Sequence, residues 1–261
     1  DKILKIALEN SVDAIHPGYG FLSENAEFSK KVRDAGLLFI GPKAETMTLM
    51  GDKIESKKSM EELSIPIIPG YHGDDQTDSF LKTKANEIGY PVLIKASAGG
   101  GGKGMRVVES EDLFLESLLS ARREAKKAFG NDKVLIEKFI TNPRHIEIQV
   151  LSSTHNEHFH LFERECSIQR RHQKIIEESP SVALDEKLRQ EMCSTATQIT
   201  KGINYEGAGT IEFILDKDGS YYFLEMNTRL QVEHPITEMV TGIDLVRCQI
   251  EIAEGKPLSF K

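Results

Sequence analysis

A hairpin near the end of the chain carries two glutamates that could share one cation. The apolar stretches on either side of Asp216–Gly219 predict two strands, and the polar run between them predicts the turn. A two-residue loop at Asp218–Gly219 would place Glu212 directly opposite Glu225. A loop made of Lys217–Asp218, or of the whole polar run, would make the two glutamates diagonal neighbours on the same face. A three-residue loop would instead move Glu225 to the opposite face.

Glu212, Glu225 and Asn227 share one strand face with either of the even-numbered loops. Two carboxylates about 4 Å apart repel by roughly 4 kcal/mol at an effective dielectric constant near 20, so a shared proton or a cation must offset the repulsion. A set of oxygen ligands suits Mg²⁺ or Mn²⁺, which can also bridge nucleotide phosphates. The alternative is the solvent face of an edge hairpin, where charged side chains are common.

Polar residues continue beyond this hairpin. Arg229, Gln231 and Glu233 alternate along the chain next to the proposed metal ligands. Arginine suits a planar carboxylate or bicarbonate, and Glu233 could act as a general base on such a bound acid. A second polar stretch, Cys166–Lys174, is basic in an otherwise acidic protein. It is either an exposed loop or a surface that attracts nucleotide and an anionic second substrate.

A glycine-rich segment joins two predicted strands and contains Gly99, Gly100, Gly101, Gly102 and Gly104. Glycines allow backbone N–H groups to surround phosphate oxygens, because no Cβ is in the way. The segment is not a Walker A motif, which needs Gly-Lys-Ser/Thr at the start of a helix. It is not a Rossmann fingerprint either, since a strand follows it. A flexible hairpin loop is the alternative interpretation.

Lys95 lies inside an apolar predicted strand, where lysine is poorly tolerated without an anionic partner. An ATP phosphate is a plausible partner. Lys53 could supply a second cation, although alone it would be interpreted as an exposed lysine. The predicted strand that follows the glycine-rich lobe could present the backbone of Glu137, Lys138 and Ile140 to the edge of an adenine ring.

Composition limits the class of protein. The 261 residues are 39% hydrophobic and 28% charged, which is enough for one sizeable core or for two to three smaller lobes. The net charge of −8 argues against a nucleic-acid partner. No stretch approaches the roughly 18 uninterrupted apolar residues of a membrane span. Cys166, Cys193 and Cys248 are odd in number and far apart, so we expect neither a disulfide framework nor a Cys-only zinc site, and a reducing compartment.

Alternating predicted helices and strands indicate an α/β (α+β) fold. Near the start, short strands at Ala14–His16 and Leu37–Ile40 alternate with helices, which favours a parallel sheet. A later helix is predicted from Ser110, as its N-cap, to about Phe129. The chain divides into four predicted regions: a partial N-terminal lobe at 1–43, a helical connector at 44–67, a glycine-loop lid at 68–139 and a strand-rich metal and catalytic lobe at 140–261.

These segments together resemble the biotin carboxylase family of ATP-grasp enzymes. The matching pieces stand in family order and span nearly the whole chain: "HPGYGFLSEN", "GDK", "IKASAGGGGKGM", "IEKFI", "NPRHIEIQV", "ERECSIQRRHQKIIEESP", "GTIEF" and "FLEMNTRLQVEHPITE". The resemblance implies an ATP-grasp fold with an N-terminal Rossmann-like (pre-ATP-grasp) lobe. Since the family normally extends beyond both ends of this sequence, we expect the chain to be a fragment.

The resemblance also implies roles for individual residues. ATP would be held by Lys53, Lys95, the 99–104 loop, Glu137, Lys138, Ile140, His145, Gln169 and His172. Mg²⁺ or Mn²⁺ would be bound by Glu212 and Glu225, with Asn227 assisting. Bicarbonate would be surrounded by Arg229, Gln231, Val232 and Lys174, and Glu233 would deprotonate it. Tyr19 would lie near the biotin ring.

The activity implied is ATP-dependent carboxylation of biotin by bicarbonate through carboxyphosphate, giving ADP and phosphate. Its partners would be a biotin carboxyl carrier and a carboxyltransferase, in a parent that is a homodimer or a larger assembly. The implied location is the bacterial cytoplasm or the mitochondrial matrix. We expect the fragment to bind ATP but to turn over poorly. Two alternatives are another ATP-grasp carboxylate ligase, such as a carbamoyl phosphate synthetase-like module, and a non-catalytic nucleotide-binding fragment.

Overall fold

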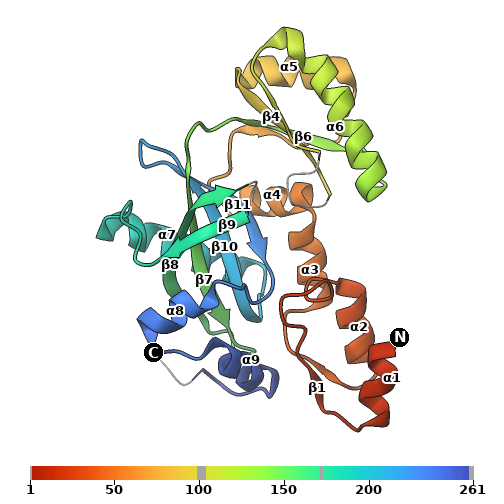
Figure 1. Cartoon of the computed structure of the whole chain (residues 1–261), viewed down its shortest axis with the longest axis vertical. Helices are drawn as coiled ribbons and strands as arrows, with labels where there is room; N and C mark the ends of the chain where they lie inside the picture. Colours follow the sequence, from red (N-terminus) through yellow and green to blue (C-terminus); the bar gives the residue numbers. More distant parts are fainter. Residues whose placement is uncertain (1, 99–103, 171–172, 259–261) are drawn as a thin grey trace.

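The computed structural model describes residues 2–98, 104–170 and 173–258. The predicted phosphate-loop glycines Gly99, Gly100, Gly101 and Gly102, and the predicted ATP ligand His172, lie outside the described residues. Figure 1 shows a central sheet with a smaller α/β lobe at one end and a helical N-terminal region at its side. Among the described residues, no helix combines the length and the apolar character that a membrane span requires.

The N-terminal region contains α1 (Lys2–Glu9), β1 (Ala14–Ile15), α2 (Ala26–Asp34) and β2 (Leu38–Phe39). β1 and β2 pair in parallel, which confirms the orientation predicted from the alternating pattern. α2 begins where the side chain of Asn25 accepts a hydrogen bond from the Phe28 amide. Phe28 and Phe39 then pack together in a small core.

Two consecutive helices, α3 (Ala44–Gly51) and α4 (Lys53–Glu62), connect this region to the rest of the chain. Asp52 separates them, and its Oδ1 accepts hydrogen bonds from the amides of Ile54 (2.8 Å) and Glu55 (3.1 Å). This N-cap starts α4 immediately after Asp52. As a result Lys53, the first residue of the helix, has a fixed position at the edge of the cavity described below.

The smaller lobe, called the lid here, is a four-stranded sheet covered by two helices on one face (Figure 1). The strand order is β3-β6-β4-β5, and the pairs are antiparallel. The predicted N-cap role of Ser110 is wrong: its side chain makes no capping bond, and a 3₁₀ turn (Glu111–Leu113) precedes the α-helix. The elements are β3 (Gly70–Tyr71), α5 (Asp78–Ile88), β4 (Val92–Ala96), β5 (Arg106–Val108), α6 (Phe114–Phe129) and β6 (Val134–Lys138).

The larger sheet has the strand order β11-β10-β7-β8-β9 and is antiparallel throughout. Along β7 the apolar side chains face one way and pack under α7, whereas His145, Glu147 and Gln149 point to the other face, as the alternation predicted. The strands are β7 (Arg144–Ser152), β8 (His158–Arg170), β9 (Gln173–Glu178), β10 (Gly207–Leu215) and β11 (Tyr221–Asn227). The helices that follow or intervene are α7 (Glu186–Gly202), α8 (His234–Thr241) and α9 (Leu245–Ala253).

The β10–β11 hairpin does not have either of the expected even-numbered loops. The Asp216 amide donates to the Ser220 carbonyl, so three residues form the loop, and Gly219 at its end has a left-handed φ of 88°. With regular pairing from this turn, Glu225 would point to the opposite face. A one-residue register shift, typical of a β-bulge, lies between the Phe213–Phe223 pair and the next pair, and it restores Glu225 to a position opposite Glu212.

Candidate active site

A cavity of about 810 Å³ opens between the lid and the larger sheet. Every described residue for which the sequence predicted a role lines it, with the exception of Gly104: Tyr19, Lys53, Lys95, Glu137, Lys138, Ile140, His145, Gln169, Lys174, Glu212, Glu225, Asn227, Arg229, Gln231, Val232 and Glu233. Gly104 has a φ of +71°, which strains other residues, and a Cβ there would lie 3.0 Å from the Cβ of Ala96, so glycine is favoured at this position.

On the lid side, one buried carboxylate lies between two lysines. Glu137 is ion-paired through one oxygen to Lys57 of α4, and through the other to Lys95 of β4, at 2.5 Å. Burial alone would raise the pKa of Glu137, but the attraction of Lys95 and Lys57 outweighs burial and lowers the pKa to about 2. The anionic partner of Lys95 within the chain is therefore Glu137, whereas the sequence suggested a nucleotide phosphate.

The lysine pair leaves the lid wall positively charged, since one carboxylate faces two ammonium groups. Lys53 adds a further cation, and burial together with the neighbouring Lys95 lowers its pKa, although Glu225 acts in the opposite direction. Lys138 differs from these lysines, because its Nζ donates to the carbonyls of Gly89 (2.8 Å) and Tyr90 (3.1 Å). Its side chain thus holds the start of β4 rather than facing the cavity as a free cation.

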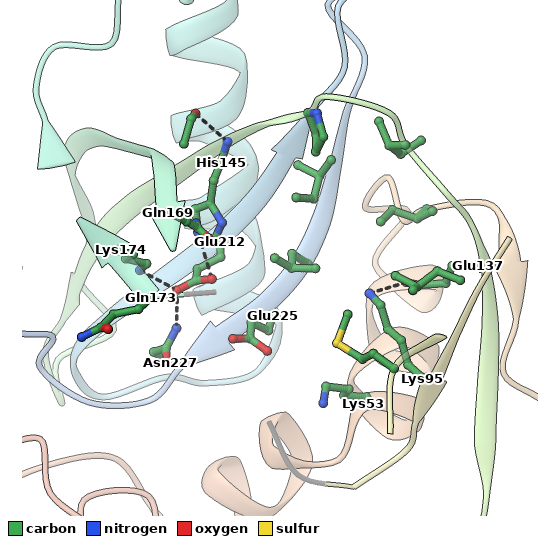
Figure 2. A pocket seen from close by; sticks show the side chains of 18 of the residues that line it. Lys53, Lys95, Glu137, His145, Gln169, Gln173, Lys174, Glu212, Glu225 and Asn227 are labelled. Atoms are coloured by element: carbon green, nitrogen blue, oxygen red, sulfur yellow. Dashed lines mark hydrogen bonds and ion pairs between the residues drawn. The ribbon is translucent and has the colours of Figure 1, made fainter. Parts of the chain in front are cut away.

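On the sheet side, Glu212 accepts most of the hydrogen bonds. Its Oε1 accepts from Lys174 Nζ (2.9 Å), Asn227 Nδ2 (2.8 Å) and Gln231 Nε2 (3.1 Å), and its Oε2 lies 3.0 Å from His145 Nε2 (Figure 2). Burial would raise the pKa of Glu212, but His145 and Lys174 outweigh burial and lower the pKa to about 2. Glu212 is therefore held as a carboxylate.

The pKa of Glu225 shifts in the opposite direction from that of Glu212. Burial and the charge of Glu212 raise its pKa, and the attraction of Lys53 and Lys95 offsets this only in part. Glu225 is thus a second carboxylate opposite Glu212 whose charge the nearby lysines do not fully compensate. A divalent cation bound by oxygen ligands would supply the missing positive charge. Figure 2 shows Glu225 between the lysines of the lid side and Glu212 with Asn227. The donor set present is thus consistent with the Mg²⁺ or Mn²⁺ site predicted from the sequence.

His145 connects Glu212 to a deeper carboxylate, Glu147. Burial lowers the pKa of His145, but its interactions with the carboxylates of Glu147 and Glu212 outweigh burial and raise it to about 9. Ligand atoms of these three residues lie within 4.8 Å of one another. Ion pairing of an imidazolium with two carboxylates accounts for that arrangement without a metal ion.

Lys174 of β9 lies among three carboxylates. Its Nζ contacts Glu147, Glu212 at 2.9 Å and Glu233 at 2.5 Å. Burial opposes its charge, but the three carboxylates outweigh burial and raise the pKa of Lys174. Glu233 immediately precedes α8 as its N-cap residue, so its position depends on where that helix is anchored. A carboxylate held beside an ammonium group at the cavity wall can accept a proton from a bound acid.

The remaining predicted residues lie around this core. Arg229 donates from Nη2 to Asn227 Oδ1 (3.1 Å) and from Nε to Glu24 Oε2 (3.0 Å). The side-chain amide of Gln169 donates to the Cys166 carbonyl at 2.8 Å. Tyr19 and Val232 line the cavity with largely exposed side chains. The structure therefore brings the two polar stretches, Cys166–Lys174 and Asn227–Glu233, together at one site.

Sequence reasoning missed four residues that hold this site: Lys57, Glu147, Arg164 and Glu24. A signal existed for Glu147, because it shares a strand face with His145 in an alternating segment. Lys57 lies one helical turn after Lys53, on the same side of α4. Glu24 and Arg164 gave no local signal, since their partners lie far away in the sequence.

Comparison with known proteins gives a consistent answer. The domain family described as the carbamoyl-phosphate synthase L chain, ATP binding domain, matches residues 52–261, and the biotin carboxylase N-terminal domain matches residues 1–47. The alpha subunit of mitochondrial methylcrotonoyl-CoA carboxylase from Rattus norvegicus is 54% identical over 99% of this chain and 36% of its own length. Biotin carboxylase from Haemophilus influenzae is 52% identical over 99% of this chain and 58% of its own length.

Solved structures agree. The complex of biotin carboxylase from Campylobacter jejuni with a β,γ-ATP ligand superposes with a TM-score of 0.96 and 50% identity, over 99% of this chain and 58% of that chain. The biotin carboxylase domain of 2-oxoglutarate carboxylase from Hydrogenobacter thermophilus, solved with MgADP, ADP and bicarbonate, gives a TM-score of 0.95 and 48% identity, over 100% of this chain and 57% of that chain. The chain thus spans about a third to three fifths of the length of these relatives. The chain therefore belongs to the biotin carboxylase family of ATP-grasp proteins.

Proposed function

We propose that the protein containing this chain carboxylates biotin on a carrier, using ATP and bicarbonate and releasing ADP and phosphate. The observation that carries the proposal is the pairing of Glu233 with Lys174 at 2.5 Å, in the same cavity as the Glu212–Glu225 pair and the lysines of the lid. A carboxylate base, a carboxylate-binding arginine and a polyphosphate-binding wall are the groups needed to join an inert acid to a phosphoryl group.

The residues divide the work between the two walls of the cavity. Lys53 and Lys95 neutralise phosphate oxygens on the lid side. Glu212 and Glu225, with Asn227, would hold Mg²⁺ or Mn²⁺, which would supply charge neutralisation at the phosphates when bound. These assignments rest on residue chemistry and on the placement of the side chains around the cavity.

On the sheet wall, the acid substrate is bound and deprotonated. Arg229, Gln231, Val232 and Lys174 would surround bicarbonate, and Glu233 would accept its proton. Lys174 then stabilises the negative charge at this point, because it already contacts Glu233. Tyr19, at the mouth of the cavity, would lie near the biotin ring. For ATP, the adenine would lie against Glu137, Lys138 and Ile140, with further contacts from His145, Gln169, His172 and the 99–104 loop.

The proposed partners are a biotin carboxyl carrier and a carboxyltransferase, in a parent that is a homodimer or a larger assembly. Relatives that include a mitochondrial alpha subunit and a bacterial biotin carboxylase support the mitochondrial matrix or the bacterial cytoplasm as the compartment. A second candidate, another ATP-grasp carboxylate ligase, is supported by the match of residues 52–261 to the carbamoyl-phosphate synthase domain.

The test is ADP release by the intact parent with Mg²⁺ and bicarbonate, with and without free biotin. Strong stimulation by biotin supports the carboxylase function. Release that requires bicarbonate but ignores biotin favours the second candidate. Nucleotide binding without bicarbonate-dependent release would contradict both functions and leave a non-catalytic nucleotide-binding protein.

A further inference from the structure

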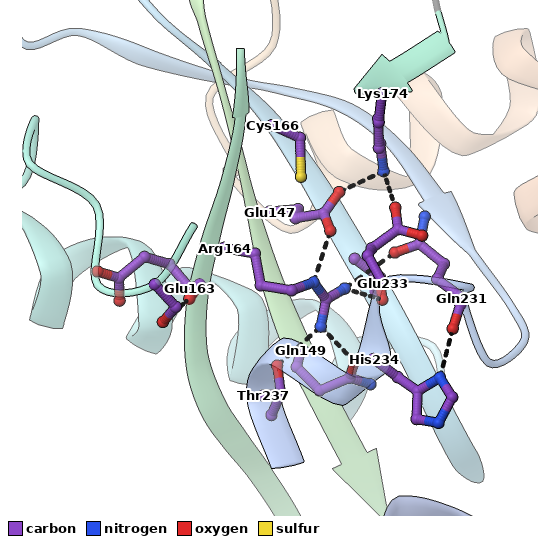
Figure 3. A network of polar contacts seen from close by, with 12 residues as sticks. Glu147, Gln149, Glu163, Arg164, Cys166, Lys174, Gln231, Glu233, His234 and Thr237 are labelled. Atoms are coloured by element: carbon purple, nitrogen blue, oxygen red, sulfur yellow. Dashed lines mark hydrogen bonds and ion pairs between the residues drawn. The ribbon is translucent and has the colours of Figure 1, made fainter. Parts of the chain in front are cut away.

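Arg164 of β8 is fully buried, and every N–H group of its guanidinium has a partner. The group donates five hydrogen bonds, to Glu147 Oε1 (2.7 Å), Gln149 Oε1 (2.7 Å), Thr237 Oγ1 (2.8 Å), Thr210 Oγ1 (3.1 Å) and Gln231 Oε1 (3.0 Å). A guanidinium has five N–H donors, so none is left over. These partners come from β7, from β10, from the segment after β11 and from α8. Figure 3 shows four of them, Glu147, Gln149, Gln231 and Thr237, around the guanidinium.

Arg164 does not line the cavity, but two of its partners contact groups that do. Gln231 accepts from Arg164 through its carbonyl oxygen, so its amide nitrogen must face the other way, where it donates to Glu212 at 3.1 Å. Glu147 binds Arg164 through one oxygen and Lys174 through the other. Arg164 therefore fixes which atom each of these two side chains turns toward the site.

The guanidinium also anchors both sides of Glu233. Gln231 lies two residues before Glu233, and Thr237 lies in the first turn of α8 after it. Because one rigid planar group binds both, the short segment that carries Glu233 is held at its two ends. The same segment contains Val232, which lines the cavity, as does Arg229, two residues before Gln231.

Charge complements this geometry. Glu147, Glu212 and Glu233 lie close together around Lys174, and even with the imidazolium of His145 beside Glu147 and Glu212 only two positive charges face three carboxylates. Arg164 neutralises Glu147 from behind, at 2.7 Å, so that Lys174 remains shared with Glu212 and Glu233. A buried carboxylate without such a partner would be strongly unfavourable.

From these contacts we infer that Arg164 is a positioning residue for the acid-substrate end of the site: it orients Gln231 and Glu147 and holds the segment that carries Glu233. The inference rests on the proposed bicarbonate chemistry. It predicts a selective defect, because the five donors of Arg164 are all used on partners in the larger sheet and the segment after it, whereas Lys95, a proposed phosphate-binding lysine, pairs with Glu137.

The experiment uses the intact parent with Arg164→Lys, which keeps the charge but loses the planar fork. We expect kcat/KM for bicarbonate to fall about 10- to 100-fold, the size typical of a misplaced reacting group, while KM for ATP stays within about threefold. Arg189→Lys is the matched control, since Arg189 also binds a buried glutamate, Glu163, through Nε at 3.0 Å, but on α7. We expect this control to leave both parameters within about twofold of wild type.

A milder pair of variants keeps the inference testable if Arg164→Lys does not fold. Thr237→Val and Thr210→Val each remove one acceptor of the same guanidinium, but only Thr237 lies on the helix that follows Glu233. Only Thr237→Val should lower kcat/KM for bicarbonate. Equal effects of the two threonine variants, or equal losses for ATP and bicarbonate in Arg164→Lys, would overturn the inference. A wild-type parent without bicarbonate-dependent ADP release would overturn the proposed function first, and this inference with it.

Discussion

Lys57 pairs with one oxygen of Glu137 and Lys95 with the other, so a single carboxylate inside the lid wall joins α4 to β4. The pKa of Glu137 falls from 4.5 to about 2 because the two lysines outweigh the effect of burial. The stabilisation is present above pH 4.5 and is lost as the pH falls through about 2. Its full size is about 3 kcal/mol at neutral pH.

The measurement is urea unfolding of the chain and of Glu137→Gln between pH 7 and pH 3. We expect the variant to be less stable at neutral pH, by about 3 kcal/mol or more, because it leaves two buried ammonium groups without a carboxylate. The difference between the two proteins should narrow as the pH drops below 4.5. Glu111→Gln, which removes an exposed partner of Lys82, is the control and should cost less than about 1 kcal/mol. A difference that does not change with pH would contradict the assignment.

Lys57→Met should weaken ATP binding although Lys57 was not predicted to contact ATP. Without Lys57, Glu137 is balanced only by Lys95, so the positive charge available to a phosphate falls. We expect KM for ATP of the intact parent to rise about tenfold, or roughly 1.4 kcal/mol, with kcat nearly unchanged. Lys58→Met, at the neighbouring exposed position paired with Glu55, should have no such effect. A fall in kcat with an unchanged KM would argue against this explanation.

Glu225→Gln should remove most of the affinity for Mn²⁺. Binding can be followed by the electron paramagnetic resonance of free Mn²⁺ in the presence of ADP, and we expect a loss of at least about tenfold, or 1.4 kcal/mol. Without metal, the same variant should be more stable than wild type, since it relieves repulsion from Glu212. Glu206→Gln, which only removes a partner of Lys43, serves as the control. Unchanged Mn²⁺ affinity would exclude Glu225 as a ligand.

Glu233→Gln should abolish bicarbonate- and biotin-dependent turnover of the intact parent, because the amide cannot accept the proton. ATP binding should change by less than about tenfold, or 1.4 kcal/mol, since Lys95, a proposed phosphate-binding lysine, pairs with Glu137, whereas Glu233 pairs with Lys174. Glu251→Gln, which loses only an exposed contact with Arg247, should keep full turnover. A larger loss of ATP affinity would contradict the role assigned to Glu233.

The three cysteines should resist alkylation in the native chain. Cys166, Cys193 and Cys248 are buried, and burial raises the pKa of each thiol, to about 12 for Cys193 and about 11 for Cys248. Since the thiolate is the reactive form, iodoacetamide should modify them only as the chain unfolds. Mass spectrometry before and after unfolding in urea gives the count, and rapid modification of Cys166 in the native state would show that the sheet beneath Lys174 opens.

Much of the site could be predicted because its residues lie in short segments with strong local patterns. The strand alternation of His145 and Glu147, and the hairpin that carries Glu212 and Glu225, follow from the period of two along a strand. The loop length of that hairpin was predicted wrongly, because residues 216–219 permit several turns and only the paired strands decide among them.

Long-range ion pairs were beyond such reasoning. Glu24 reaches Arg229 across 205 positions of sequence, and Arg164 reaches Gln231 across 67. In both cases the partner is set by how segments distant in the sequence pack together. The neighbours of an arginine in an alternating strand do not show whether its side chain is buried or exposed. The pairing of Lys57 with Glu137 could not be predicted either, because Lys57 lies on α4 and Glu137 on β6 of the lid.

The register shift near Leu224 changes what one strand can contribute to the cavity. In a regular strand consecutive side chains point to opposite faces, yet Leu224 and Glu225 both line the cavity. Two adjacent residues thus place an apolar side chain and a carboxylate next to each other on the cavity wall. Strict alternation would put them on opposite faces of the sheet. Deletion of Leu224 would remove the register shift and leave Glu225 opposite Glu212 in a regular antiparallel pair. It would also remove the apolar side chain next to Glu225 in the cavity.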